Sequence, residues 1–384
     1  MTTSVTIPKT AGTNPLKGLL EYGQSPWMDY IRRDLLTGGG LKKMIEEDGL
    51  RGQTSNPSIF EKAIAESTLY NDILQSADAK SLNAKSLYEK IAIRDVQDAC
   101  DIFKPVYQST RRRDGYVSLE VSPYLANDQK ATLEEARRLW KTVGRENLMV
   151  KVPATPEGIP AVRQLLEDGL NINITLLFAQ SAYEQVAEAF LSALEARALK
   201  GQDVSHCASV ASFFVSRIDT LIDSKIEEKL KGASGDAKTL LSSIEGKVAI
   251  ANAKLTYKKY QELFGGARWK ALAAKGAQTQ RLLWASTSTK NPKYRDVLYV
   301  EELIGADTVD TIPPATFDAF RDHGKLRPSL TEDVAGAAKT MENLAKAGIS
   351  MKEVTQKLLE DGVKLFADAF KTLLDATGKS ASVR

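Results

Sequence analysis

Cysteine and histidine are scarce in this chain, with two residues of each among 384. Two cysteines, Cys100 and Cys207, are too few for a disulfide framework, so they indicate a reducing compartment and a cytoplasmic location. His206 and His323 are likewise too few to favour a histidine-based metal site or a Ser-His-Asp triad. Any catalytic chemistry must therefore come mainly from other residue types.

Long apolar runs and a strong charge of either sign are also missing. No stretch reaches the roughly 18 apolar residues that span a bilayer, and the N-terminus lacks the apolar core of a signal peptide. The formal net charge is only +3, and the one dense basic run, 111–113, is typical of a solvated loop. We therefore expect neither nucleic acid nor a membrane as a partner.

Short apolar runs alternate with longer amphipathic segments along the chain. The lengths and β-branched content of the runs favour strands over buried helices. The runs are 50–55, 115–123, 148–154, 172–178, 208–218, 281–287 and 307–313, with a weaker one at 25–30. Eight such strands separated by helices predict an α/β fold, a (β/α)8 TIM-type barrel with additional helices. The alternative is a doubly wound sheet, but no G-x-G-x-x-G follows the early strands.

This fold class implies a single catalytic domain with short ends. We expect a mobile N-terminal arm at 1–24, the barrel with its C-terminal helix at 25–375, and a flexible tail at 376–384.

Polar residues recur where the predicted strands end, and this is the end of a (β/α)8 barrel that carries the chemistry. Two of them are ionisable and interrupt otherwise apolar strands, Glu120 in "VSLEVSP" and Lys151 in "LMVKVPA". The others are Thr54, Ser55, Asn56, Asn173, Thr175, Ser212, Arg217, Ser286 and Lys290. Glu120 and Lys151 could form a structural ion pair, but a buried pair contributes little stability, which favours a chemical role.

Lys151 suits one chemistry in particular. Burial disfavours the charged form of a lysine, and a free amine attacks carbonyls to give a Schiff base. The protonated Schiff base withdraws electrons and so helps to break an adjacent carbon–carbon bond. Such a mechanism also needs a carboxylate that moves protons, and Arg or Lys beyond the strand ends would bind a substrate phosphate.

Several motifs in order along the chain carry a family resemblance. They are "GLRGQTSNPSIFEKAI", "LMVKVPATPEGIPAVRQL", "NINITLLF" and "LLWASTSTKNPKY". Together they resemble the transaldolases, in particular the longer, single-function bacterial branch, over about residues 25 to 375. The resemblance implies a (β/α)8 enzyme of the pentose phosphate pathway without metal or organic cofactor. Such an enzyme moves a dihydroxyacetone unit from sedoheptulose 7-phosphate or fructose 6-phosphate to glyceraldehyde 3-phosphate or erythrose 4-phosphate.

The resemblance also implies roles for individual residues. Lys151 matches the Schiff-base lysine, and Asp29 in "SPWMDY" matches the acid/base aspartate, with Asp34 as the competing choice. Asn56 would hydrogen-bond the substrate, and Glu120 and Thr175 would hold and activate the catalytic water. The remaining candidates bind substrate: Asn173 beside the water, Ser212 at a hydroxyl, Arg217 and Ser286 at the phosphate, and Lys290 in place of a second phosphate-binding arginine.

Two other functions fit the same barrel. A fructose-6-phosphate aldolase would release free dihydroxyacetone, but related aldolases carry a tyrosine where this chain has Phe214, so Phe214 favours transfer. A non-catalytic sugar-phosphate sensor would not need Lys151 or Glu120. The expected partners are therefore small sugar phosphates, and both a monomer and a homo-oligomer remain possible.

Overall fold

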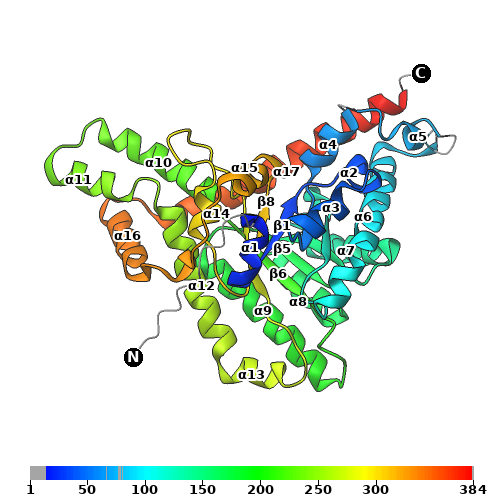
Figure 1. Cartoon of the computed structure of the whole chain (residues 1–384), viewed down its shortest axis with the longest axis horizontal. Coiled ribbons are helices and arrows are strands. Elements are labelled where there is room, and N and C mark those ends of the chain that lie inside the picture. The colour runs from blue at the N-terminus through cyan, green and yellow to red at the C-terminus, as the bar shows by residue number, and fades with distance from the viewer. Residues whose placement is uncertain (1–13, 66, 77–78, 80, 383–384) are drawn as a thin grey trace.

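Eight parallel strands close into a barrel in the computed structural model, which describes residues 14–65, 67–76, 79 and 81–382. Each strand pairs with the next along the chain, and the last pairs with the first, which confirms the predicted (β/α)8 fold (Figure 1). The strands are β1 (Gln24–Asp29), β2 (Gly52–Thr54), β3 (Tyr116–Glu120), β4 (Leu148–Pro153), β5 (Ile172–Leu177), β6 (Ser209–Phe214), β7 (Arg281–Ala285) and β8 (Thr308–Ile312).

Burial on both faces explains why the strand sequences are apolar almost throughout. Every residue of β4, β5 and β6 is buried, because one face points into the barrel and the other lies under helices. The strand predicted at 25–30 is β1, whose pattern is weaker because it contains Pro26. Its Trp27 packs against Gly52 of β2, where an added Cβ would lie 2.5 Å from the indole ring.

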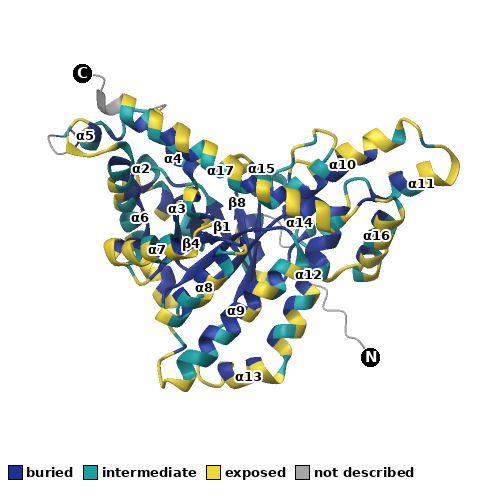
Figure 2. Cartoon of the chain, turned by 180° about the vertical axis from the view of Figure 1, so that it is seen from behind, coloured by how far each residue is buried: buried dark blue, intermediate teal, exposed yellow. Residues whose placement is uncertain are grey.

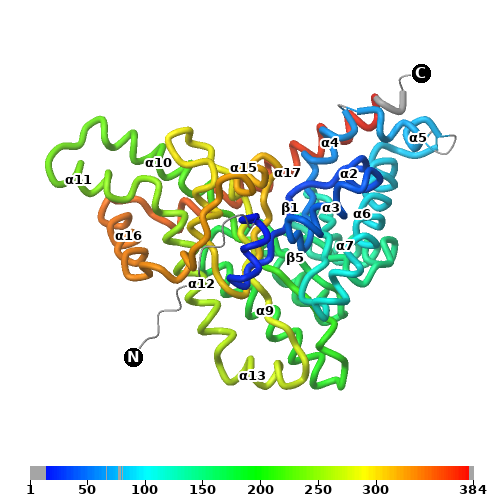
Figure 3. Tube along the Cα trace, viewed as in Figure 1, coloured from blue at the N-terminus to red at the C-terminus, as the bar shows by residue number. Residues whose placement is uncertain are grey.

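The helices form an outer layer, as Figures 1 and 3 show. Those that precede β5 are α1 (Pro15–Gly18), α2 (Arg33–Thr37), α3 (Gly40–Glu47), α4 (Pro57–Ala65), α5 (Asn71–Leu74), α6 (Ala84–Ser109), α7 (Gln129–Val143) and α8 (Gly158–Asp168), with 3₁₀ helices η1 (Leu19–Tyr22) and η3 (Pro123–Leu125). Those that follow β5 are α9 (Gln180–Leu199), α10 (Ser216–Leu230), α11 (Gly235–Ile244), α12 (Val248–Gly265), α13 (Ala267–Ala273), α14 (Leu298–Glu302), α15 (Pro314–His323), α16 (Val334–Lys346) and α17 (Met351–Ser382), with η4 (Ser329–Thr331).

Some helices are additional to the pattern of one helix after each strand. Helices α11 and α16 pack against each other and against α10 and α12 on one side of the barrel (Figure 1). The long C-terminal α17 packs against α4, α6, α10 and β5, so it runs over the barrel instead of along its side. None of the helices among the described residues is both long and apolar enough to cross a membrane.

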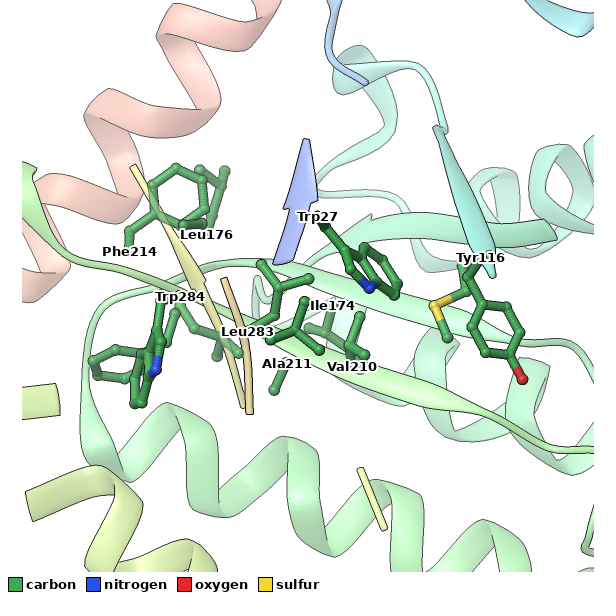
Figure 4. Packing of buried hydrophobic residues seen from close by; sticks show 14 of the residues in the cluster. Trp27, Tyr116, Ile174, Leu176, Val210, Ala211, Phe214, Leu283 and Trp284 are labelled. Atoms are coloured by element: carbon green, nitrogen blue, oxygen red, sulfur yellow. The ribbon is translucent and has the colours of Figure 1, made fainter. Parts of the chain in front are cut away.

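The hydrophobic core is continuous from the strands to the inner faces of the helices (Figure 2). Trp27 and Tyr116 lie at one end of the group of core residues in Figure 4, with ring centroids 6.5 Å apart. Leu176 and Phe214 lie at the other end, beside a turn of α17.

A buried ion pair occupies the N-terminal end of the barrel. Arg281, the first residue of β7, lies 2.8 Å from Asp114 and donates a hydrogen bond of 2.8 Å to Ser25 Oγ. Ser25 Oγ in turn donates to Asp114 Oδ2 at 2.9 Å. The polar atoms at this end bond to one another, which leaves the opposite end for a ligand.

The expected ends of the domain need adjustment. Residues 1–13 of the predicted arm lie outside the described residues, whereas 14–24 are ordered and packed, with Leu16 and Leu19 fully buried. Asn14 begins α1, because its side chain accepts a hydrogen bond from Leu16 N. At the other end, the predicted tail from 376 continues α17 as far as Ser382, and Thr377 is buried.

Candidate active site

A pocket of about 180 Å³ opens at the C-terminal ends of the strands. Its lining is Asp29, Thr54, Asn56, Lys151, Thr175, Ser212, Phe214, Arg217, Ala285, Ser286, Ser288, Lys290, Thr311, Pro313 and Phe366. All predicted site residues are in this lining except Glu120 and Asn173, and both of these contact a residue that is. Asp34 is not in the lining and forms an exposed ion pair with Arg32, so the geometry favours Asp29.

Lys151 lies at the centre of one wall of the pocket. Strand pairing places it beside Glu120 of β3 and Asn173 of β5, because the three residues are register partners in neighbouring strands. The side chain is 6% exposed, and its Nζ is 3.3 Å from Glu120 Oε2. Nζ also donates a hydrogen bond of 3.2 Å to the backbone oxygen of Ser55. The amine is therefore buried yet open to a ligand in the pocket.

Two carboxyl groups face this amine, and burial shifts both. The pKa of Glu120 is raised because the group is desolvated, although the charge of Lys151 opposes the rise. The pKa of Asp29 is raised for the same reason, opposed by Lys151 and by a hydrogen bond of 2.7 Å from Thr54 Oγ1. Carboxyl groups with raised pKa values in a pocket are suited to proton transfer near neutral pH.

Two buried oxygen atoms in this wall have no hydrogen-bond partner among the described residues. They are Glu120 Oε2, whose contact with Lys151 does not have hydrogen-bond geometry, and Thr175 Oγ1. Buried polar atoms are normally paired, so this deficit indicates a place for a polar ligand or water. The next residue, Leu176, has a φ of 60°, and the pairing of β5 with β6 shifts there. Such a bulge changes where the strand directs its side chains.

Asn56 connects the first two strands of the site. Its Oδ1 accepts a hydrogen bond of 3.2 Å from Ile59 N in the first turn of α4, which fixes the side chain. Its Nδ2 lies 3.5 Å from Asp29 Oδ2, within the pocket.

The opposite wall of the pocket carries two cationic side chains. Arg217 and Lys290 form no ion pair among the described residues, and Arg217 instead lies over the Phe214 ring at 5.5 Å. Burial lowers the pKa of both, and the charge of Arg217 lowers that of Lys290 further. Arg217 is in the first turn of α10, where the positive end of the helix dipole also favours an anion.

Ser286 completes this cationic wall. Its backbone has a φ of 56°, its Oγ lies 2.9 Å from Ser216 Oγ, and its carbonyl accepts a hydrogen bond of 3.1 Å from Ser216 N. The turn after β7 is thereby tied to the start of α10, and Lys290 follows in the same loop.

Asn173 and Ser212 form a hydrogen-bonded pair on neighbouring strands. Ser212 Oγ donates to Asn173 Oδ1 at 2.6 Å, and Asn173 Nδ2 donates to Ser118 Oγ at 3.0 Å. Because its proton is used in this bond, Ser212 Oγ faces the pocket as an acceptor.

Six lining residues had no role assigned from the sequence: Thr54, Ala285, Ser288, Thr311, Pro313 and Phe366. Thr54 ends β2 and Thr311 is the last residue but one of β8, and their Oγ1 atoms are 2.7 Å apart. The strand-end rule that found the other residues applies to both of them. Phe366 comes from α17, where nothing in the sequence pattern points toward the pocket.

Comparison with known proteins gives one consistent result. The model of the family described as Transaldolase/Fructose-6-phosphate aldolase matches residues 26–377. A protein named Transaldolase from Trichodesmium erythraeum is 47% identical over 367 residues, with 95% of this chain and 97% of that protein covered. Transaldolase 2 from Nostoc punctiforme is 48% identical, with the same coverage. Transaldolase from Thiobacillus denitrificans is 44% identical, with 95% of this chain and 100% of that protein covered.

Proposed function

The chain belongs to the transaldolase/fructose-6-phosphate aldolase family and is a transaldolase, and we propose that it works through a Schiff base on Lys151. The observation that carries this assignment is the buried Lys151 amine, 3.3 Å from Glu120 and in one pocket with Asp29. The substrates are sugar phosphates. The donor is sedoheptulose 7-phosphate or fructose 6-phosphate, and the acceptor is glyceraldehyde 3-phosphate or erythrose 4-phosphate.

The first steps use the amine and the two carboxyl groups. Lys151 Nζ attacks the ketose carbonyl, and the resulting carbinolamine loses water to give an iminium ion. Asp29 takes the proton of the hydroxyl group on the carbon that will leave, and the carbon–carbon bond breaks. The aldose phosphate departs, and the electron pair moves toward the nitrogen to give an enamine. Attack of this enamine on the acceptor aldehyde reverses the sequence.

Glu120 and Thr175 are assigned to the water that enters and leaves the carbinolamine. Their unpartnered oxygen atoms support this role, because one water could bond to both. Glu120→Gln should slow imine formation and hydrolysis while substrate binding is kept. Unchanged single-turnover kinetics would argue against the assignment.

The phosphate group is assigned to the cationic wall. Arg217, Lys290 and Ser286 offer two charges and a hydroxyl, and the start of α10 adds the positive end of its helix dipole. Asn56 and Ser212 face the hydroxyl groups of the substrate between the two walls.

Transfer is favoured over simple aldol cleavage because Phe214 presents an apolar ring to the pocket. The ring packs at 5.2 Å from Phe178 and carries no hydroxyl that could protonate the bound three-carbon unit. We also infer that the enzyme serves the pentose phosphate pathway as one catalytic domain, which comprises the predicted 25–375, the packed residues 14–24 and the end of α17. A cytoplasmic location agrees with two free, buried cysteines, Cys100 and Cys207.

Borohydride trapping tests the central assignment. The chain is incubated with fructose 6-phosphate, reduced with sodium borohydride and mapped by mass spectrometry, with Lys151→Met as the matched control. We expect a reduced three-carbon adduct on Lys151 and none in the variant. An adduct on another lysine, or none in the wild type, would refute the proposal.

A second assay measures the release of glyceraldehyde 3-phosphate from fructose 6-phosphate, with and without the acceptor erythrose 4-phosphate, and so tests transfer. Release that depends on the acceptor supports the transferase, whereas equal release without it identifies an aldolase.

A further inference from the structure

The C-terminal helix presents one continuous face to the mouth of the barrel. Gly362, Phe366 and Phe370 follow one another at intervals of four residues, so they lie on the same side of α17. The opposite side carries exposed ion pairs, among them Lys364–Asp368. The helix is therefore amphipathic, and its apolar side faces the strands.

Each residue of this face contacts a different part of the barrel domain. A Cβ added at Gly362 would lie 2.9 Å from Leu176 Cδ2, so the missing side chain lets α17 approach the bulge of β5 (Figure 4). Phe366 lies over the catalytic amine, with Lys151 Nζ 5.6 Å from the ring centroid. Phe370 packs edge-on against Tyr88 and Tyr124, with centroid distances of 5.6 and 5.4 Å.

Helix α17 is thus fixed on both sides of Phe366. The close approach at Gly362 holds it against β5, which carries Thr175, and the aromatic contacts of Phe370 hold it against α6 and η3. Phe366 lines the pocket and is half-buried, whereas its neighbour Leu365 is 52% exposed. The ring above Lys151 therefore has a defined position.

We propose that Phe366 is a water-excluding residue that keeps the three-carbon intermediate on Lys151 until an acceptor arrives. This inference rests on the proposed function. An apolar ring beside the iminium nitrogen stabilises its positive charge and takes the space through which bulk water would reach it.

The competing reaction that the ring suppresses is hydrolysis. The enamine carbon takes up a proton to give the iminium ion. Water then adds its oxygen to the iminium carbon and loses a proton. The carbon–nitrogen bond breaks, its electron pair stays on Lys151 Nζ, and free dihydroxyacetone leaves. The net reaction consumes one water, and solvent supplies it.

The test follows the decay of the intermediate without an acceptor. The enzyme is loaded with fructose 6-phosphate, the released aldehyde is removed enzymatically, and samples are reduced with borohydride at successive times. Phe366→Ala is compared with Phe366→Leu, which keeps an apolar side chain, and with Leu365→Ala, which alters the exposed side of the same helix. Thermal unfolding verifies that each variant is folded.

We expect decay to be about tenfold faster in Phe366→Ala, the factor that a cation–π contact of this kind corresponds to. Phe366→Leu should fall between, and Leu365→Ala should match the wild type.

The outcomes separate the two proposals. If the wild type forms no adduct on Lys151, the proposed function fails. If the adduct forms in every variant and decays at the wild-type rate in folded Phe366→Ala, only the role of Phe366 is overturned. Faster decay in Leu365→Ala as well would also overturn it, because the effect would then not be specific to the ring.

Discussion

Replacement of Lys151 by methionine tests the electrostatics of the site together with its chemistry. Methionine keeps the length of the side chain but removes the amine, so the buried Glu120 loses the cation 3.3 Å away. The charge of Lys151 now opposes the rise in the pKa of Glu120, so we expect that pKa to rise further in the variant. Glu120 then takes up a proton on folding, because ionisation without a partner is more costly.

The free energy needed to protonate Glu120 sets the size of the loss of folding stability. The ordinary pKa of an unfolded glutamate is about 4.5, so at pH 7 protonation costs at most about 3 kcal/mol. Between the unfolded and the folded pKa the folded state binds more protons, so stability falls as pH rises. For a chain of 384 residues the unfolding entropy is about 0.8 kcal/mol per kelvin, so the melting temperature should fall by at most about 4 °C.

The assay is thermal unfolding of the wild type, Lys151→Met and Lys151→Met/Glu120→Gln between pH 5 and pH 8, with activity measured at pH 7. We expect the single variant to be inactive, with a deficit in melting temperature that grows with pH. The double variant should be inactive but regain the lost stability. A deficit that is constant with pH, or that persists in the double variant, would refute the reasoning about the pair.

Three further predictions concern the phosphate wall and the buried carboxyl groups. Arg217→Gln should raise KM for fructose 6-phosphate by about 10- to 100-fold with a small change in kcat. It should also weaken inhibition by inorganic phosphate. A fall in kcat as large as the rise in KM would contradict a role in phosphate binding. Burial raises the pKa of Asp310 to about 8, so Asp310 should contribute a loss of about 1.4 kcal/mol of stability per pH unit between pH 5 and pH 7. Asp310→Asn should reduce the dependence of stability on pH by this amount, and equal pH slopes in the variant and the wild type would contradict the prediction. Arg281→Met leaves Asp114 buried without its cation, so unfolding should become easier by about 3 to 5 kcal/mol with KM unchanged; a changed KM would mean that this end of the barrel reaches the site.

The strands could be predicted because the barrel buries them on both faces. Continuous apolar runs such as 148–154 leave little choice of structure, and any polar residue within them stands out. Lys151 and Glu120 were found in this way, and strand pairing places them at partner positions. The packed N-terminal stretch was not predicted, because α1 and η1 are too short for a periodic pattern.

The remaining features depend on tertiary structure. Ser286 has a φ of 56° and is hydrogen-bonded to Ser216 at the start of α10, a residue distant in the sequence, so no local pattern predicts this conformation. In the sequence, nothing distinguishes Phe366 from the other apolar residues of an amphipathic helix. It lies near Lys151 only because α17 runs over the barrel. Thr311 lies at a strand end, so the sequence carried the signal for it.

The charges of the two walls explain why a phosphorylated ketose fits the pocket. On the wall of β1, β3 and β4 the amine of Lys151 faces the carboxyl groups of Asp29 and Glu120, so this wall holds a basic group together with acidic groups. On the opposite wall Arg217 and Lys290 have no carboxylate among the described residues. A phosphate carries a charge of about −1.5 to −2 at neutral pH, which matches two cations. Binding of the phosphate there leaves the carbonyl end of the substrate to face Lys151. The wall of Arg217 and Lys290 therefore orients the ketose, and the wall of Lys151, Asp29 and Glu120 performs the chemistry.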